Sequence, residues 1–298
     1  MYDSIVVGAG PAGLTASIYL ARAGKKVLVL EALSYGGQII NTLDIENYPA
    51  APHISGVDFA TNLYNQAKEL GAEIKFERVV EITKEKTVKT TSNEYNAKSI
   101  ILATGNENRK LGLDNESELV GKGISYCATC DGGFYKGKIV AVNGGGNTAL
   151  EDALYLADIA DKVYLIHRRD EFRGDAVSVE KLKEKDNVEF ILNSKITKLN
   201  SNDVLESIDI EDNNGNKKTI DVNGLFIAIG RIPENESFKN VVECDSAGYV
   251  ISDDNCHTNV EGIFVAGDGR CKELRQLVTA TSDGAIAATE AIKYINNL

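Results

Sequence analysis

The chain has 298 residues, of which 43% are hydrophobic and 26% are charged, and its formal net charge is -12. This composition excludes a disordered chain, and the length allows one or two domains with sizeable cores. The negative charge argues against nucleic acid or an anionic membrane as the main partner, and no apolar run approaches the roughly 20 residues that span a bilayer. The sequence enters a strand-like run directly after Met1, without a signal-peptide pattern, so we expect a cytoplasmic protein.

The N-terminal segment predicts a dinucleotide site. Ser4 to Val7 is expected to form a buried strand, followed by a glycine-rich turn, a helix over 12–23 and a second strand over 26–31. The turn at 8–13 reads GAGPAG and fits G-x-G-x-x-G, in which small residues let a pyrophosphate approach the start of a helix. Glu31 ends the second strand, where a carboxylate can bind a ribose diol. The alternative is an ordinary tight turn.

Five cysteines are present, and only Cys127 and Cys130 have a spacing that carries chemistry. Two thiols in C-x-x-C suit a disulfide that opens and closes, with one thiolate attacking and the other resolving. A zinc site is the alternative, although it needs further Cys or His ligands from distant parts of the chain. Asp131 follows the pair, where it can cap a helix or protonate a leaving thiolate. The sequence leaves both roles of Asp131 open.

A second strand, glycine turn, helix and strand follow over 138–169. The turn at 144–149 reads GGGNTA, and the strand after it ends in His167, Arg168 and Arg169, with Arg173 close behind. Guanidinium groups bind a phosphate bidentately, whereas a carboxylate would repel it. The second turn therefore suits NADP, and the first suits a ribose without a 2′-phosphate. The alternative is that these basic residues form a solvated face.

Three apolar runs end in glycine, at 99–105, 224–230 and 262–267, and a helical run extends from Arg275 to Tyr294. Because the second dinucleotide unit lies between the first two runs, we expect an insertion. The predicted fold class is α/β, with two Rossmann-like, three-layer dinucleotide-binding domains, the second inserted in the first. The predicted limits are 1–112 and 246–298 for an FAD-binding domain, and 113–245 for an NADPH-binding domain that carries the cysteine pair.

Taken together, these motifs resemble the low-molecular-weight, prokaryotic-type thioredoxin reductases along essentially the whole chain. The matching segments are GAGPAG at 8–13, GGQI at 36–39, ATG at 103–105, CATCDG at 127–132, GGGNTA at 144–149, HRRDEFR at 167–173, GD at 267–268 and RQ at 275–276. Departures are Asn147 and Thr148, where many relatives have Asp and Ser, Asn106, where Ala is usual, and Cys271, where a charged residue is usual.

The resemblance implies a flavoenzyme that passes electrons from NADPH through FAD to the Cys127 and Cys130 pair, with Asp131 as proton donor, and then to thioredoxin or a similar small protein disulfide. We also expect a homodimer, no metal, and no nucleic-acid or membrane partner. The residues expected to bind FAD are Gly8, Gly10, Pro11, Ala12, Gly13, Glu31, Gly37, Gln38, Asn47, Val80, Ala103, Thr104, Gly105, Gly267, Asp268, Arg275, Gln276 and Leu277. Those expected to bind NADPH are Gly144, Gly146, Asn147, Thr148, Ala149, His167, Arg168, Arg169, Arg173, Ile229 and Gly230.

Two other functions remain open from the sequence. Some related flavoproteins take electrons from ferredoxin in place of NADPH, and this chain keeps the basic cluster that favours NADPH. A flavin-bound redox sensor that uses the cysteine pair as a switch is the non-enzymatic alternative. It would show thiol oxidation without steady turnover of NADPH.

Overall fold

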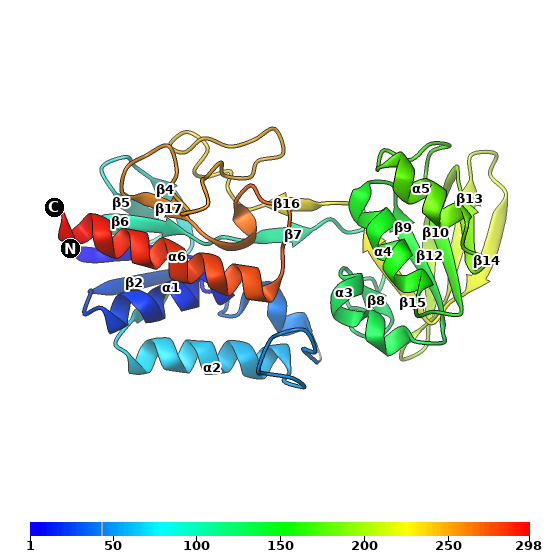
Figure 1. Ribbon diagram of the computed structural model, residues 1–298, viewed down its shortest axis with the longest axis horizontal. Coiled ribbons are helices and arrows are strands. Elements are labelled where there is room, and N and C mark those ends of the chain that lie inside the picture. The colour runs from blue at the N-terminus through cyan, green and yellow to red at the C-terminus, as the bar shows by residue number, and fades with distance from the viewer. Residues whose placement is uncertain (43) are drawn as a thin grey trace. The chain divides into compact units, whose positions relative to one another are not determined.

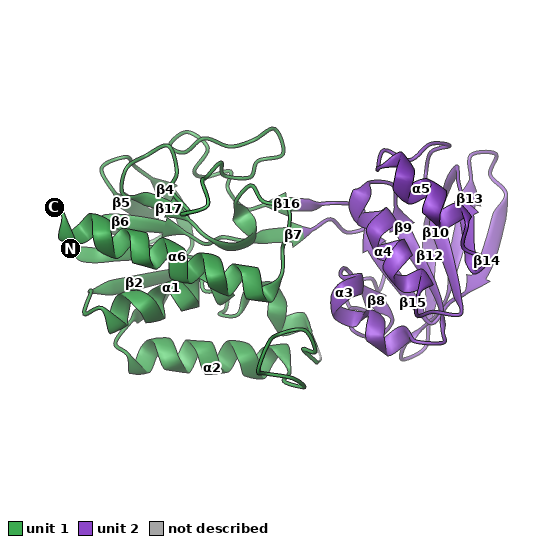
Figure 2. Ribbon diagram, viewed as in Figure 1, with its two compact units in different colours: residues 1–107, 232–298 green, residues 108–231 purple. Residues whose placement is uncertain are grey.

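The computed structural model describes residues 1–42 and 44–298. These residues divide into two compact units, one formed by Met1–Glu107 with Ile232–Leu298 and the other by Asn108–Arg231 (Figure 1 and Figure 2). The second unit is inserted in the chain of the first. Each unit is built on a parallel sheet with helices on one face, which confirms the predicted fold class of two Rossmann-like domains.

The chain passes between the units twice, at β7 (Asn106–Asn108) and at β16 (Arg231–Pro233), and these two strands pair with each other. The return comes earlier than the predicted limit at 245. Residues 232–245 belong to the first unit because Phe238 and Val242, each 2% exposed, are buried in its core. This segment forms no helix, so its two buried side chains leave no periodic pattern in the sequence.

The first unit contains a seven-stranded sheet in the order β3-β2-β1-β6-β5-β4, with β17 paired to β6. The strands β1, β2, β3, β6 and β17 are parallel, and β4 and β5 extend the sheet as an antiparallel pair. The predicted runs at 4–7, 26–31 and 99–105 all lie in this parallel part. The strands are β1 (Tyr2–Val7), β2 (Val27–Glu31), β3 (Glu73–Phe76), β4 (Val79–Ile82), β5 (Thr87–Thr90), β6 (Glu94–Leu102) and β17 (Ile263–Val265).

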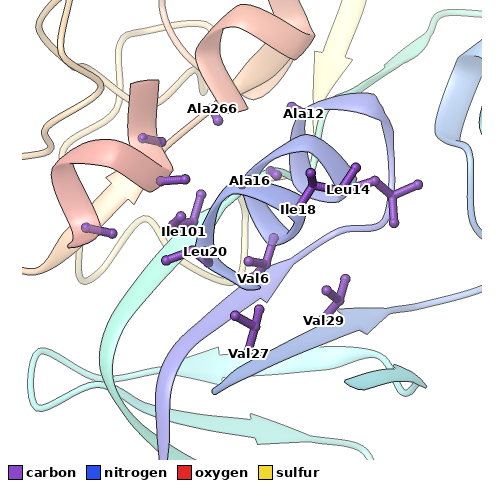
Figure 3. Close-up of a cluster of buried hydrophobic side chains, with 14 of the residues drawn as sticks. Val6, Ala12, Leu14, Ala16, Ile18, Leu20, Val27, Val29, Ile101 and Ala266 are labelled. Atoms are coloured by element: carbon purple, nitrogen blue, oxygen red, sulfur yellow. The ribbon is translucent and has the colours of Figure 1, made fainter. Parts of the chain in front are cut away.

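Helices cover one face of this sheet (Figure 3). The helix α1 follows the first glycine turn, and its side chains Leu14 and Ile18, four residues apart, are buried against Val6 and Val29 of the sheet. The residues that alternate with these, such as Ile5 and Val7 of β1, face the opposite core. The helices of this unit are α1 (Pro11–Arg22), α2 (Gly56–Glu69) and α6 (Leu277–Asn296), with short 3₁₀ turns η1 (Gly37–Asn41) and η3 (Gly267–Gly269).

The second unit has a parallel five-stranded sheet in the order β11-β10-β9-β15-β8. Val140 and Val142 face a core made with α4, whereas Ala141 faces the opposite core, which an antiparallel sheet β12-β13-β14 closes. The elements are β8 (Ile124–Ser125), α3 (Ala128–Asp131), η2 (Gly132–Tyr135), β9 (Ile139–Gly144), α4 (Asn147–Ala157), β10 (Lys162–Ile166), α5 (Ala176–Lys183), β11 (Val188–Ile191), β12 (Ser194–Ser201), β13 (Leu205–Asp212), β14 (Lys217–Asp221) and β15 (Gly224–Ala228).

None of the helices in the described parts of the chain combines the length and the apolar character that a membrane span requires.

Candidate functional site

In the first glycine turn, Gly8 and Gly13 have no room for a side chain, whereas Gly10 does. A Cβ atom on Gly8, whose φ is +107°, would lie 2.3 Å from the carbonyl oxygen of Ala103, and one on Gly13 would lie 2.0 Å from the carbonyl oxygen of Gly8. At Gly10 the nearest atom to such a Cβ is the Cα of Gly37, 3.9 Å away. Gly8 and Gly13 therefore pack the turn against the sheet, and Gly10 leaves room for a ligand group.

Helix α1 starts directly after this open position. Its N-cap residue is Gly10, which has no side chain to cap the helix, so the first N–H groups can face an anion. Glu31, at the end of β2, accepts hydrogen bonds from the backbone N–H of Ala9 at 2.8 Å and of Leu33 at 3.0 Å. The carboxylate thus lies against the turn, where sequence reasoning places the ribose of a dinucleotide.

The residues after β6 lie beside the first turn. The Thr104 hydroxyl donates to Asn235 Oδ1 at 2.8 Å, and the Asn235 amide donates to the carbonyl of Gly269 at 2.8 Å. Asn235 is only 2% exposed and joins two segments of the predicted FAD site. Sequence reasoning missed it because it belongs to no motif. Asn106, which departs from the family's usual residue, is buried and donates to the Asp268 carbonyl at 3.4 Å.

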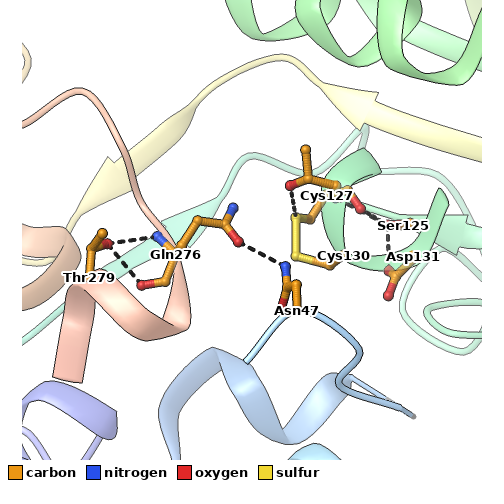
Figure 4. Close-up of a disulfide and its surroundings, with 8 residues drawn as sticks. Asn47, Ser125, Cys127, Cys130, Asp131, Gln276 and Thr279 are labelled. Atoms are coloured by element: carbon orange, nitrogen blue, oxygen red, sulfur yellow. Dashed lines mark hydrogen bonds between the residues drawn. A yellow bond between two sulfur atoms is a disulfide. The ribbon is translucent and has the colours of Figure 1, made fainter. Parts of the chain in front are cut away.

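Predicted flavin-binding residues gather where α6 begins. Gln276 is the N-cap of α6 and forms a capping box with Thr279, and the Asn47 amide donates to Gln276 Oε1 at 3.1 Å (Figure 4). The Arg275 guanidinium lies 4.1 Å from the centroid of the Tyr249 ring and donates to the Asp268 carbonyl at 3.4 Å. Asn47 is therefore brought together with Asp268, Arg275 and Gln276 from a distant part of the sequence.

A cluster of charged side chains, formed by Asp283, Arg270 and Lys272, lies next to Gly267. Asp283 of α6 accepts a hydrogen bond from the backbone N–H of Gly267 at 3.1 Å, from Arg270 at 3.0 Å and from Lys272 at 2.8 Å. The thiol of Cys256 lies against the same cluster, and burial raises its pKa to about 12. The sequence gives no signal for this cluster beyond the spacing of GD and RQ.

The other residues predicted to bind FAD occupy separate places in the first unit. Gly37 and Gln38 lie in η1, and a Cβ on Gly37 would lie 3.3 Å from the Cα of Gly10. Pro11 and Ala12 form the first turn of α1, and Leu277 is the first residue of α6. Val80 lies on β4 and is 46% exposed.

Cys127 and Cys130 form a disulfide in the second unit, with Cα atoms 5.3 Å apart (Figure 4). Cys127 is the N-cap residue of α3, and Cys130 lies within that helix. Ser125 donates to Asp131 Oδ2 at 2.6 Å, and burial raises the pKa of the Asp131 carboxyl above its ordinary value while this hydrogen bond lowers it. The Asp131 side chain makes no capping hydrogen bond among the described residues. Because the sulfurs are bonded to each other, neither is available to a metal in this state.

The second glycine turn, like the first, has one tightly packed glycine and one with open space beside it. A Cβ on Gly144 would lie 2.3 Å from the carbonyl oxygen of Ala228, whereas one on Gly146 would meet no atom within 4 Å. Gly146 is the N-cap of α4 and has no side chain to cap that helix. Asn147 Oδ1 accepts a hydrogen bond from the backbone N–H of Asp175 at 2.8 Å, so this side chain fixes the start of α5.

The predicted basic cluster separates into one buried and three exposed side chains. His167 is 5% exposed and stacks on Phe172 with ring centroids 5.3 Å apart. A Cβ on Gly145 would lie 2.2 Å from the His167 ring, so the ring packs against the glycine turn. Burial, with a smaller contribution from the neighbouring arginines, lowers the His167 pKa and favours the neutral ring. The exposed members are Arg168, Arg169 and Arg173, and the remaining predicted residues Ile229 and Gly230 directly follow β15.

Comparisons with known proteins agree with this arrangement. Residues 2–284 match the family described as pyridine nucleotide-disulphide oxidoreductase. Thioredoxin reductase of Peptoclostridium acidaminophilum is 44% identical over 306 residues, covering 99% of this chain and 97% of that protein. Thioredoxin reductase of Listeria monocytogenes is 41% identical over 303 residues, covering 100% of this chain and 95% of that protein.

Solved structures show the same likeness. The crystal structure of thioredoxin reductase from Streptococcus pyogenes has a TM-score of 0.95 and 38% identity, covering 100% of this chain and 99% of that one. Thioredoxin reductase from Giardia duodenalis has a TM-score of 0.93 and 35% identity, covering 99% of both chains. The chain belongs to the pyridine nucleotide-disulphide oxidoreductase family and, within it, to the low-molecular-weight thioredoxin reductases.

Proposed function

We propose that the chain is an NADPH-dependent flavoprotein that reduces the disulfide of thioredoxin, with Cys127 and Cys130 as its redox pair. The observation that carries this proposal is the closed disulfide beside Asp131, a partly buried carboxyl whose pKa is raised. A raised pKa makes a carboxyl a better donor of the proton that a leaving thiolate takes. The disulfide shares its unit with a glycine turn and an exposed arginine cluster that suit a nicotinamide dinucleotide.

The residues of the first unit fit FAD. Gly10 leaves open space at the uncapped start of α1, where a pyrophosphate would accept backbone hydrogen bonds, and Glu31 would bind the adenosine ribose. Asn47, Arg275 and Gln276, which surround the start of α6, would hold the flavin ring. Met1–Glu107 with Ile232–Leu298 is thus the proposed FAD-binding domain.

The residues of the second unit fit NADPH. Gly146 leaves open space at the uncapped start of α4, and Arg168, Arg169 and Arg173 are exposed after β10, where a 2′-phosphate would be bound. His167 would pack against the glycine turn at Gly145 and would not contact the phosphate. When bound, the two cofactors would supply the one electron pair that opens the disulfide, which NADPH would give up as a hydride and FAD would pass on.

The cysteines themselves carry out the exchange with the partner. Once the pair is reduced, one thiolate attacks a sulfur of the thioredoxin disulfide, a mixed disulfide forms, and the other partner sulfur leaves with its electron pair. The second cysteine then attacks the mixed disulfide, which restores the Cys127–Cys130 bond and releases the partner as a dithiol. Asp131 supplies a proton to the cysteine thiolate that leaves when the pair is opened, and Ser125 orients its carboxyl.

The donor is tested by supplying NADPH or photoreduced ferredoxin to the FAD-loaded enzyme, with oxidised thioredoxin as acceptor. Steady thioredoxin reduction with NADPH supports the proposal. Turnover with ferredoxin alone would assign the chain to the ferredoxin-fed group, and thiol oxidation without turnover would indicate a redox sensor. We also propose a homodimer, on the resemblance alone, which light scattering of the FAD-loaded protein tests directly.

A further inference from the structure

Glu116, a buried residue that belongs to none of the motifs, lies in the loop where the chain enters the second unit. It is only 2% exposed, and three successive backbone N–H groups donate to its carboxylate. Leu111 donates to Oε1 at 2.9 Å, and Gly112 and Leu113 donate to Oε2 at 2.8 Å and 3.4 Å. Gly112 has a φ of +78°, the left-handed conformation that turns neighbouring N–H groups toward one anion. The loop therefore encloses the carboxylate of its own Glu116.

A fourth donor joins this carboxylate to the redox pair. The Tyr126 hydroxyl donates to Glu116 Oε1 at 2.9 Å, and Tyr126 is the residue directly before Cys127. Its ring packs against the same hydrophobic core as Leu111 and Leu113. A hydrogen bond to a buried carboxylate is charge-assisted, and the buried charge requires such bonds to replace its lost hydration. The contact therefore holds Tyr126 firmly to the loop.

The residue before Tyr126 is held as well, and it reaches both the redox pair and the acid. Ser125 lies on β8, which pairs with β15 of the parallel sheet. The backbone N–H of Cys127 donates to Ser125 Oγ at 3.0 Å, and the Ser125 hydroxyl donates to Asp131 Oδ2 at 2.6 Å. The backbone that carries Cys127 is thus fixed by the sheet through Ser125 and by the buried carboxylate through Tyr126.

We propose that Glu116 is a positioning residue of the redox pair, which acts through the Tyr126 hydroxyl and holds Cys127 where it reacts beside Asp131. The inference deepens the proposed function and rests on it. A reacting group that is misplaced by about 1 Å can lose about 100-fold in rate, so a tether one residue away from the sulfur matters. The electron pair that opens the disulfide comes from the reduced flavin, and Glu116 contributes only position.

The first measurement is hydrogen exchange of the backbone N–H groups at 125–131 in the oxidised, FAD-loaded enzyme, for the parent and for Tyr126→Phe. The variant loses only the hydroxyl, so Glu116 keeps its three backbone donors and the loop at 111–113 should keep its protection. We expect exchange at 125–131 to become about 10-fold faster, because the segment opens more readily without its tether. Unchanged exchange would overturn the inference. The measurement uses neither NADPH nor thioredoxin, so its result is independent of whether the chain reduces thioredoxin.

The second measurement compares two electron acceptors with NADPH as donor. Ferricyanide takes electrons directly from a reduced flavin, whereas thioredoxin takes them through the cysteine pair. We expect kcat with thioredoxin to fall about 10-fold in Tyr126→Phe, and turnover with ferricyanide to stay at the parent rate. Equal losses with both acceptors would show general damage to the second unit, and unchanged turnover with thioredoxin would show that the tether has no catalytic role. Either result would overturn the inference.

Ser117→Ala is the matched control, since Ser117 follows Glu116 and accepts an exposed hydrogen bond from Lys110 at 3.2 Å. It should match the parent in both measurements. Glu116→Gln removes the carboxylate itself, and adding Tyr126→Phe to it should lower thioredoxin turnover no further, because both changes break one contact. Losses that multiply in the double variant would mean that the two residues act separately, and the inference would be wrong. If Glu116→Gln does not fold, Tyr126→Phe alone decides, because it keeps the carboxylate and its backbone donors.

Discussion

The Ser125 hydroxyl donates a hydrogen bond to the Asp131 carboxylate at 2.6 Å, beside the Cys127–Cys130 disulfide. This contact opposes burial, which raises the pKa of Asp131. It also fixes the direction of a carboxyl that the sequence alone could assign either to helix capping or to proton transfer. The predictions below follow from this site and from the two glycine turns.

Replacing Asp131 by Asn should lower thioredoxin reduction by about 100-fold or more, which is the usual contribution of a positioned acid. The same change should also make the variant increasingly stable relative to the parent as pH rises. Because the folded pKa of Asp131 is raised, the unfolded chain loses this proton first, and the parent is destabilised as pH increases from the unfolded pKa through the folded pKa. Urea unfolding at several pH values, beside steady-state turnover, checks both effects. A parallel loss of activity and stability would mean that Asp131 has only a structural role.

Replacing Arg168 or Arg169 by Ala should reduce kcat/KM for NADPH by about 10- to 150-fold, since a charge-assisted contact contributes roughly 1.5–3 kcal/mol. The value for NADH should change little because NADH has no 2′-phosphate. Lys181→Ala, an exposed basic residue on α5 of the same unit, is the control for a general change in charge. Equal losses with both nucleotides would argue against phosphate recognition.

Replacing Gly146 by Ala should leave the fold intact and weaken nucleotide binding. A Cβ at this position meets no atom of the protein within 4 Å, so only a bound ligand would be displaced. We expect KM to rise about 10-fold or more for NADPH and for NADH alike, because both carry the pyrophosphate. Gly144→Ala is the contrast, since its Cβ would lie 2.3 Å from the Ala228 carbonyl and should damage the fold itself. An unchanged KM for Gly146→Ala would show that the nucleotide lies elsewhere.

Replacing Asp283 by Ala should destabilise the protein by about 3–5 kcal/mol, because it leaves the buried guanidinium of Arg270 without its carboxylate and removes the nearer of the two carboxylates beside Lys272. Lys293→Ala, which removes an exposed ion pair with Glu290 on the same helix, should cost less than about 1 kcal/mol. Urea unfolding followed by circular dichroism compares the two variants. Similar losses of unfolding free energy in the two variants would mean that the buried cluster around Asp283 stabilises the protein no more than an exposed ion pair does.

Much of the fold followed from local patterns. The apolar runs at 4–7 and 139–142 lie in β1 and β9, and each is followed by a glycine turn and a helix, because a buried parallel strand and an uncapped helix start both leave clear sequence signals. The limit at 245 was wrong since the segment from Ile232 packs by irregular contacts that have no period.

The sequence predicted those parts of the site whose functional residues are close together along the chain. Cys127, Cys130 and Asp131 are neighbours in sequence, so their proximity needed no fold. Asn235 acts through contacts with residues 131 and 34 positions away, and Asp283 through residues 11 to 16 positions away. Ser125 looks like an ordinary strand residue in the sequence. His167 shows the opposite case, because its basic neighbours suggested a phosphate ligand whereas burial makes it a support for the turn.

The central claim is that electrons from NADPH reach thioredoxin through the Cys127–Cys130 pair. The most direct measurement is NADPH oxidation by the FAD-loaded enzyme in the presence of oxidised thioredoxin, for the parent, Cys127→Ser, Cys130→Ser and the exposed-cysteine control Cys271→Ser. Turnover by the parent and by Cys271→Ser, with a loss of about 1,000-fold or more in each variant of the pair, is the result that we predict. Thioredoxin reduction at the parent rate by either Cys127→Ser or Cys130→Ser would contradict the account.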